Sequence, residues 1–182
     1  MNQKTIYYLK RRTAELAIGS STLRNQGAVG VVKATRQFLA NLDLKVFSVN
    51  SIQKFNKALD RSTEDLIRVL PKSARNWGTA RKALNIFLRD CIYNQFLSSH
   101  FTISQIHPWL EVPLDSHVAS GLRATSHKKN LPRWGSIKKL KREDSDKYQD
   151  AAEKVADKIE CNRVDLDIYL WRQLGIKEIQ NI

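Results

Sequence analysis

Apolar residues recur every three or four positions along residues 78–97 (GTARKALNIFLRDCIYNQFL), and this spacing constrains the fold more than any other feature of the sequence. The stripe consists of Ala80, Ala83, Leu84, Phe87, Leu88, Cys91, Ile92 and Phe96. A helix places such residues on one face, whereas a strand would need strict alternation. The spacing predicts one long helix packed against a core, with Lys82, Asn85 and Arg89 in a polar row on its other side.

The same helical spacing covers most of the remaining chain. It predicts helices over residues 31–42, 48–59, 61–71, 144–161 and 163–175, while residues 44–49 alone could pair briefly as a strand. Ser62 and Asp65 have the spacing of a capping arrangement at the start of the helix over 61–71. The sequence therefore predicts an all-α fold.

The length of 182 residues, of which 42% are hydrophobic, is enough to bury one sizeable core. We expect a single helical domain over residues 1–182, built as one body or as two lobes. The segment 125–136 (TSHKKNLPRWGS) has the composition of a linker. It would separate a central bundle over 45–125 from a second lobe made of 1–44 and 136–182.

Several classes of protein are disfavoured by what the sequence lacks. The two cysteines, Cys91 and Cys161, lie in helical patterns without the histidine spacing of a zinc site, so we expect free thiols and neither metal nor cofactor. No apolar run approaches the roughly 20 residues of a membrane span, and the N-terminus lacks the apolar core of a signal peptide. We expect a cytoplasmic protein without a membrane partner or an obligate protein partner.

The charge distribution points to a polyanionic partner. Lys and Arg number 31 against 18 acids, which gives a net charge of +13. Basic residues are gathered in three segments: Lys10, Arg11, Arg12, Arg24, Lys33 and Arg36; Lys72, Arg75, Arg81, Lys82 and Arg89; and Arg123, Lys128, Lys129, Arg133, Lys138, Lys139, Lys141 and Arg142. A surface that follows phosphates needs such segregation. A solvated face kept for solubility is the plainer alternative.

The turn RNWGT (75–79) introduces the long helix and could bind phosphate. Backbone amides of Gly78, Thr79 and Ala80 would lie at the positive end of the helix dipole. Every helix has such an end, so the turn alone does not establish a binding site.

Asp115 stands at the start of another predicted helix, in the segment EVPLDSHVASGL (111–122). Val112 and Pro113 favour an extended approach, after which Asp115 occupies the N-cap position. An aspartate there often does nothing but cap the helix. His117, two residues later, does not share its helix face, and we expect it to serve a structural role.

The order of these parts resembles the helix-hairpin-helix DNA glycosylases. In that family a glycine turn holds the DNA backbone, and a later segment of the form apolar-Asp-x-His-Val supplies a catalytic aspartate. LDSHV (114–118) matches this segment, while NWGTARKA (76–83) has one glycine where the family hairpin has two. DLDIYLW (165–171) is similar to a C-terminal helix of the 8-oxoguanine glycosylases, and the archaeal branch is nearest in its long lysine-to-aspartate interval. The resemblance covers roughly residues 60–175.

The resemblance implies a helix-hairpin-helix bundle and specific roles. Asp115 would be the catalytic carboxylate and Lys82 the Schiff-base lysine, with Arg81 as the alternative by a one-residue shift. The resemblance, together with the basic segments, suggests that double-stranded DNA would meet Trp77, Gly78, Thr79, Arg81, Arg133 and Trp134. Asn25 and Gln26 form a polar turn that could contact a flipped base. A buried carboxylate can stabilise the positive charge that develops on the sugar, and a neutral amine can displace the base.

Three functions remain open on the sequence. The first is a glycosylase, with or without lyase activity, whose target is an oxidised purine, a modified cytosine or a phage-type modified base, in repair or in defence against foreign DNA. The second is a non-enzymatic basic DNA-binding protein in which Asp115 only caps a helix. The third is an RNA-binding protein.

Overall fold

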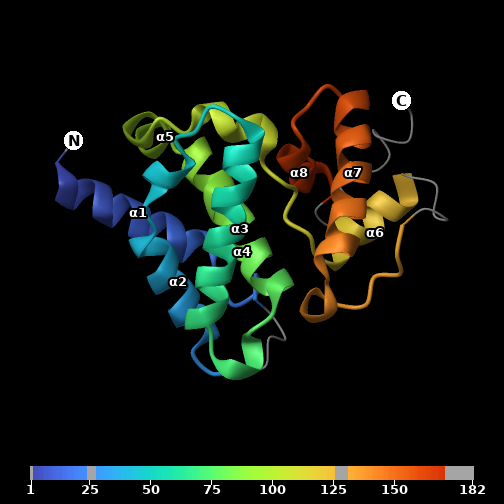
Figure 1. Ribbon diagram of the computed structural model, residues 1–182, viewed down its shortest axis with the longest axis horizontal. Coiled ribbons are helices and arrows are strands. Elements are labelled where there is room, and N and C mark those ends of the chain that lie inside the picture. The colour runs from blue at the N-terminus through green and yellow to red at the C-terminus, as the bar shows by residue number, and fades with distance from the viewer. Residues whose placement is uncertain (1, 24–27, 126–130, 171–182) are drawn as a thin grey trace.

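The computed structural model describes residues 2–23, 28–125 and 131–170, and in these ranges every regular element is helical (Figure 1). The predicted all-α fold is confirmed. None of the helices in these ranges combines the length and apolar character needed to cross a bilayer.

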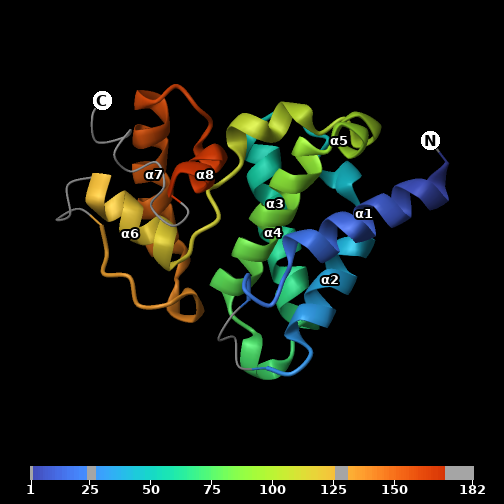
Figure 2. The ribbon, with the colours of Figure 1, turned by 180° about the vertical axis from the view of Figure 1, so that it is seen from behind.

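The first lobe is built around one central helix, α4. Its elements are α1 (Gln3–Ala17), α2 (Val31–Asn41), η1 (Leu44–Phe47), α3 (Ile52–Val69), η2 (Lys72–Ala74), α4 (Trp77–Tyr93), α5 (Gln95–Phe101) and η3 (Ser104–Trp109). Helices α1, α2, α3 and α5 all contact α4 (Figure 2). The apolar stripe predicted from the sequence is the reason, since Ala80, Leu84 and Phe87 are fully buried at the centre of this core.

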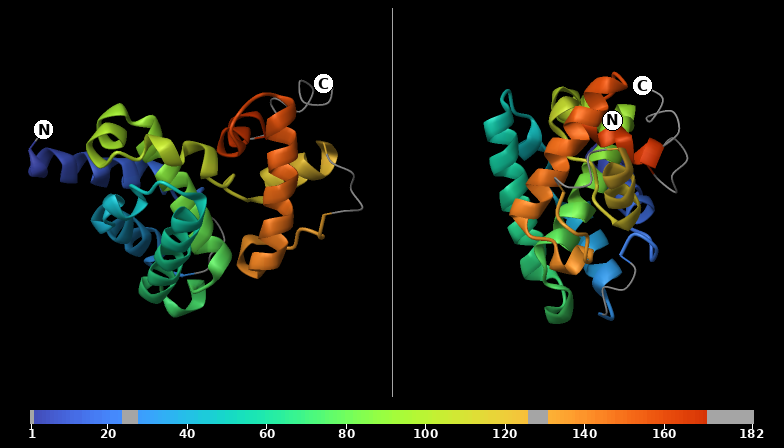
Figure 3. Two further views of the ribbon diagram at one scale, coloured as in Figure 1. Left: turned by 45° about the horizontal axis from the view of Figure 1, so that its top comes forward. Right: turned by 90° about the vertical axis from the view of Figure 1, so that its right-hand side faces the viewer.

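The second lobe has its own core. It contains α6 (Ser116–Thr125), η5 (Ile137–Lys139), α7 (Arg142–Lys158), η6 (Arg163–Asp165) and α8 (Leu166–Leu170). Val118, Tyr148 and Leu170 from three of these helices share one buried cluster. The two lobes lie side by side and are joined by the extended segment 110–115 (Figure 3).

The predicted lobe boundaries are wrong. Residues 1–44 were expected beside the C-terminal helices, but Ile6, Ala14 and Leu39 pack into the same core as Phe87. Helices that follow one another in the chain generally pack together, and α1 to α5 do so here. The chain crosses to the second lobe near Val112, and residues 131–136, in the predicted linker, lie within that lobe.

Two predicted helix boundaries also differ. Ser62 does not begin a helix, because α3 continues through it and the N-cap is Ser51, whose hydroxyl accepts from Lys54 N at 3.4 Å. The long helix stops at Tyr93. Asn94 then caps α5 by accepting from Leu97 N at 3.1 Å, and Phe96 is turned to solvent with 60% of its surface exposed.

Two of the other predicted helices are present where expected, and two segments differ locally from the prediction. Helices α2 and α7 lie where periodicity placed them, whereas residues 44–47 form a 3₁₀ turn in place of a brief strand. In the predicted last helix, a 3₁₀ turn precedes α8. The residues after 170, including Trp171, lie outside the described part of the chain.

Candidate active site

Lys82 and Asp115 meet at the junction of the two lobes. Lys82 lies in the second turn of α4, and Asp115 precedes α6. Their Nζ and Oδ2 atoms are 3.2 Å apart, although 33 positions separate them in the sequence. The side chains are 12% and 25% exposed, respectively. An amine and a carboxylate are therefore paired at a site that is partly exposed to solvent.

Asp115 is held by the local structure of the chain. Pro113 and Leu114 are buried and fix the approach to α6. Oδ1 of Asp115 accepts from the backbone amides of His117 at 2.8 Å and Val118 at 3.0 Å. These bonds make Asp115 a helix cap, as the plainer alternative expected. They also leave Oδ2 facing Lys82, so the carboxylate is oriented before any ligand arrives.

Lys82 is anchored by a second contact. Its Nζ donates to the carbonyl oxygen of Thr22 at 3.3 Å, in the connection after α1. The amine therefore lies where α4, the α1–α2 connection and the start of α6 converge. The side chain of His117 is exposed to solvent.

A second charged pair adjoins this one. Arg89, two turns after Lys82 on α4, forms ion pairs with Asp90 and with Asp167 of α8. Burial raises the pKa of the Asp167 carboxyl, Arg89 opposes this shift, and the charges of Asp115 and Lys82 also act on the group. Asp167 is not among the candidate residues of the sequence analysis, and its side chain is only 20% exposed.

Arg81 belongs to a buried network and not to a DNA-contacting surface. Its guanidinium donates to both carboxylate oxygens of Glu111, at 2.8 and 2.7 Å, and to Asp60 at 3.0 Å. Only 7% of its side chain is exposed. Burial opposes the charge of Arg81, but the two carboxylates outweigh this and raise its pKa. Arg81 is therefore poorly placed to contact DNA or to act in place of Lys82, because its charge is directed inward and is paired.

The expected amide contacts at the start of α4 are also occupied. Asn76 caps the helix by accepting from Thr79 N at 2.9 Å, and its carbonyl oxygen accepts from Ala80 N at 3.4 Å. Gly78 is buried against the backbone of Ile137. A phosphate therefore does not meet a bare hairpin at Gly78 and Thr79, because the basic segment around η5 covers this end of α4.

The two tryptophans expected at the DNA surface are half-buried. The guanidinium of Arg81 lies over the ring of Trp77, 5.3 Å from its centre, and Trp134 packs edge-on against Tyr148. Arg133 is exposed, so it remains available to a phosphate. Exposed Lys138 and Lys139 lie on η5, the turn that contacts α4.

The expected base pocket is not located by the structure. Asn25 and Gln26 lie outside the described residues. The cavity that Lys82 lines, together with Gly78 and Glu111, has a volume of only about 10 Å³. This is about the space of one water molecule, so a base would have to approach the pair from its exposed side.

Comparison of the chain with protein-family models, with curated proteins and with solved structures found no match. Among the described residues, no three side chains of the His, Cys, Asp and Glu types are grouped as metal ligands would be. The candidate site therefore rests on the geometry of Lys82 and Asp115.

Proposed function

We propose that this chain is a DNA glycosylase that uses Lys82 as its nucleophile and Asp115 as the carboxylate that activates and orients it. The observation that carries the proposal is the 3.2 Å contact between Lys82 Nζ and Asp115 Oδ2. These are the two residues to which the resemblance to the helix-hairpin-helix glycosylases assigns catalytic roles. The hairpin fold of that family is part of the proposal.

The proposed chemistry begins with a proton transfer. Lys82 Nζ gives a proton to Asp115 Oδ2, and the neutral amine attacks C1′ of the target nucleotide. The bond between C1′ and the base breaks as the bond from nitrogen to C1′ forms, and the base leaves with the electron pair and takes up a proton. That proton comes from Asp115, and the carboxylate restored in this way stabilises the positive charge that develops on the sugar. Ring opening gives a Schiff base, from which loss of a proton at C2′ expels the 3′ phosphate.

DNA binding in this proposal depends on the basic segment of the second lobe. Lys138 and Lys139 are exposed on η5, Arg133 precedes them, and η5 lies against the start of α4, one turn from Lys82. The segment is held in place by Arg123, whose guanidinium donates to the carbonyl oxygens of Leu131 at 3.0 Å and Pro132 at 2.8 Å. The positive charges of this segment therefore project from a backbone that hydrogen bonds hold in place.

A non-enzymatic DNA-binding protein is the second candidate. The two amide bonds to Asp115 Oδ1 favour it, because a capping aspartate with an ion-paired lysine needs no catalytic explanation. In that case the basic segment of the second lobe would bind DNA, and Lys82 and Asp115 would have no catalytic role.

The deciding experiment is borohydride trapping on duplexes that carry 8-oxoguanine, uracil, alkylated purines or modified cytosines. A covalent adduct that disappears in Lys82→Ala but persists in Lys154→Ala, an exposed lysine on α7, would support the nucleophile. Loss of excision in Asp115→Asn, which preserves a capping residue, would support the carboxylate. Excision without an adduct would make water the nucleophile, and no excision on any duplex would favour the binder.

A further inference from the structure

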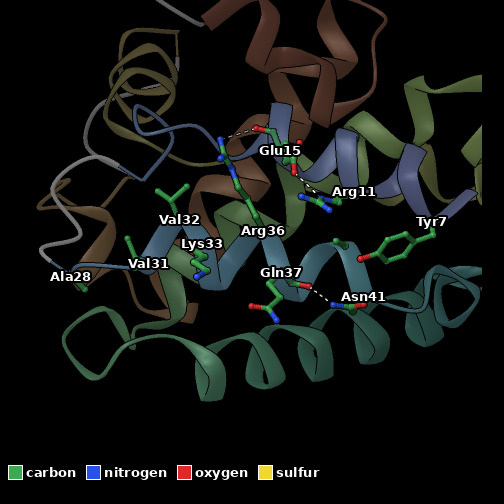
Figure 4. A pocket seen from close by; sticks show the side chains of 12 residues that line it. Tyr7, Arg11, Glu15, Ala28, Val31, Val32, Lys33, Arg36, Gln37 and Asn41 are labelled. Atoms are coloured by element: carbon green, nitrogen blue, oxygen red, sulfur yellow. Dashed lines mark hydrogen bonds and ion pairs between the residues drawn. The ribbon is translucent and has the colours of Figure 1, made fainter. Parts of the chain in front are cut away.

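A groove between α1 and α2 has no role in the proposed excision chemistry. Its volume is about 730 Å³, and Tyr7 and Arg11 line it from α1. Lys33, Arg36 and Asn41 line it from α2 (Figure 4). Its floor is apolar and includes Val31 and Ala40. The groove therefore combines cations, an aromatic ring and an apolar base.

The charge of this region is predominantly positive, although Glu15 also lines the groove. The first 42 residues contain Lys4, Lys10, Arg11, Arg12, Arg24, Lys33 and Arg36 but a single acid, Glu15, which is paired with Arg11 at 2.9 Å. Lys33 is exposed on the groove. Such a surface favours an anionic ligand.

Arg36 provides an oriented cation within the groove. It extends from α2 toward the end of α1 (Figure 4), and its Nε donates to the carbonyl oxygen of Ile18 at 2.7 Å. One terminal nitrogen donates to the carbonyl oxygen of Glu15 at 3.0 Å. Both acceptors are neutral, so these bonds fix the guanidinium without cancelling its charge.

The aromatic side chains of α1 are unusually accessible. Tyr7 is 42% exposed and Tyr8 is 53% exposed, and their rings meet edge to face with centres 5.5 Å apart. An exposed tyrosine next to cations can stack an unpaired base while the cations hold its phosphate. Bases in a duplex already have both faces covered by their neighbours, so stacking favours a single strand.

We propose that the groove between α1 and α2 binds a single-stranded nucleic-acid segment, with Tyr7 stacking on a base and Lys33 and Arg36 holding phosphates. A groove of this size accommodates one or two nucleotides. The connection after α1 links the groove to the candidate active site, since Arg36 binds Ile18 O and Lys82 binds Thr22 O. The proposal does not depend on excision chemistry.

Fluorescence anisotropy with a labelled single-stranded deoxyoligonucleotide would test the groove. Tyr7→Ala should weaken binding by about tenfold, whereas Tyr7→Phe, which keeps the ring, should bind as the wild type does. Lys33→Glu should lower the slope of log K against log salt by about 0.7 or more. Lys154→Glu, the same charge change on the other lobe, should leave this slope unaltered.

Two results would overturn the proposal. One is unchanged single-strand affinity in folded Tyr7→Ala and Lys33→Glu proteins, with circular dichroism confirming their helicity. The other is wild-type protein that binds an Asp-rich and Glu-rich peptide through the groove but not the oligonucleotide, which would assign the groove to a protein partner. Photo-crosslinking of a 5-bromodeoxyuridine strand to Tyr7 or Tyr8 would support the proposal independently.

Discussion

Replacing Glu111 by Gln should lower the free energy of unfolding by more than is usual for a residue in an extended connection. Glu111 lies where the chain passes between lobes, and only 12% of its side chain is exposed. Its carboxylate accepts three bonds, from Arg81 Nε at 2.8 Å, from an Arg81 terminal nitrogen at 2.7 Å and from Asn85 Nδ2 at 2.9 Å. Arg81 pulls the pKa of Glu111 below its ordinary value although burial acts in the opposite direction.

The expected loss follows from these bonds. A glutamine amide has one acceptor oxygen, so at least one guanidinium N–H faces an NH₂ group in either orientation of the amide. One or two bonds to a charged group would be lost, each contributing about 1.5–2 kcal/mol. Arg81 would also keep only Asp60 to balance its buried charge. We therefore expect the free energy of unfolding to fall by about 2–4 kcal/mol.

Urea denaturation followed by circular dichroism would measure this loss. Glu64→Gln is the matched control, because Glu64 is exposed on α3 and the same charge is removed without burial. A loss below about 1 kcal/mol for Glu111→Gln, or an equal loss in the control, would refute the reasoning.

Three further predictions follow from packing and ionisation. Because the pKa of Glu111 is lowered on folding, its stabilising contribution should be complete above pH of about 4.5 and be lost as pH falls, so Glu111→Gln should flatten the acid limb of stability. Gly78→Ala should lower the melting temperature, at a cost of about 1–3 kcal/mol, because a backbone carbonyl already fills the Cβ position, whereas Gly135→Ala should not. Cys161, half-buried, should react with Ellman's reagent in the native protein before Cys91, whose burial raises its thiol pKa and shields it.

Local patterns in the sequence predicted the elements well but not their partners. The stripe of α4 is buried as expected because a helix this apolar must form the centre of a core. The lobes were wrongly assigned because periodicity shows which face of a helix is apolar and not which helix will cover it. The side chain of Asn94 caps the next helix, α5, so α4 ends before Asn94 and earlier than predicted. The apolar spacing continues as far as Phe96, which hid the capping signal of Asn94.

In the candidate site, too, local features could be predicted from the sequence, whereas contacts between distant residues could not. The Asp115 cap is local and was predictable, and its contact with Lys82 was expected only through the resemblance. Arg81 and Lys82 are adjacent cations that periodicity treats alike, yet helix geometry turns them about 100° apart, so one meets Glu111 and the other Asp115. Asp167 could not have been located, since its partner Arg89 lies 78 positions away.

The two carboxylate oxygens of Asp115 make different contacts. This difference has a consequence for how the site could evolve. Oδ1 holds the helix, and Oδ2 meets the lysine. Asparagine caps helices as well as aspartate does, and the two amino acids differ by a single nucleotide in their codons. One such change would therefore remove the acidic group and spare the architecture. If the proposed function holds, a lineage on this scaffold could lose excision in one step and keep its fold.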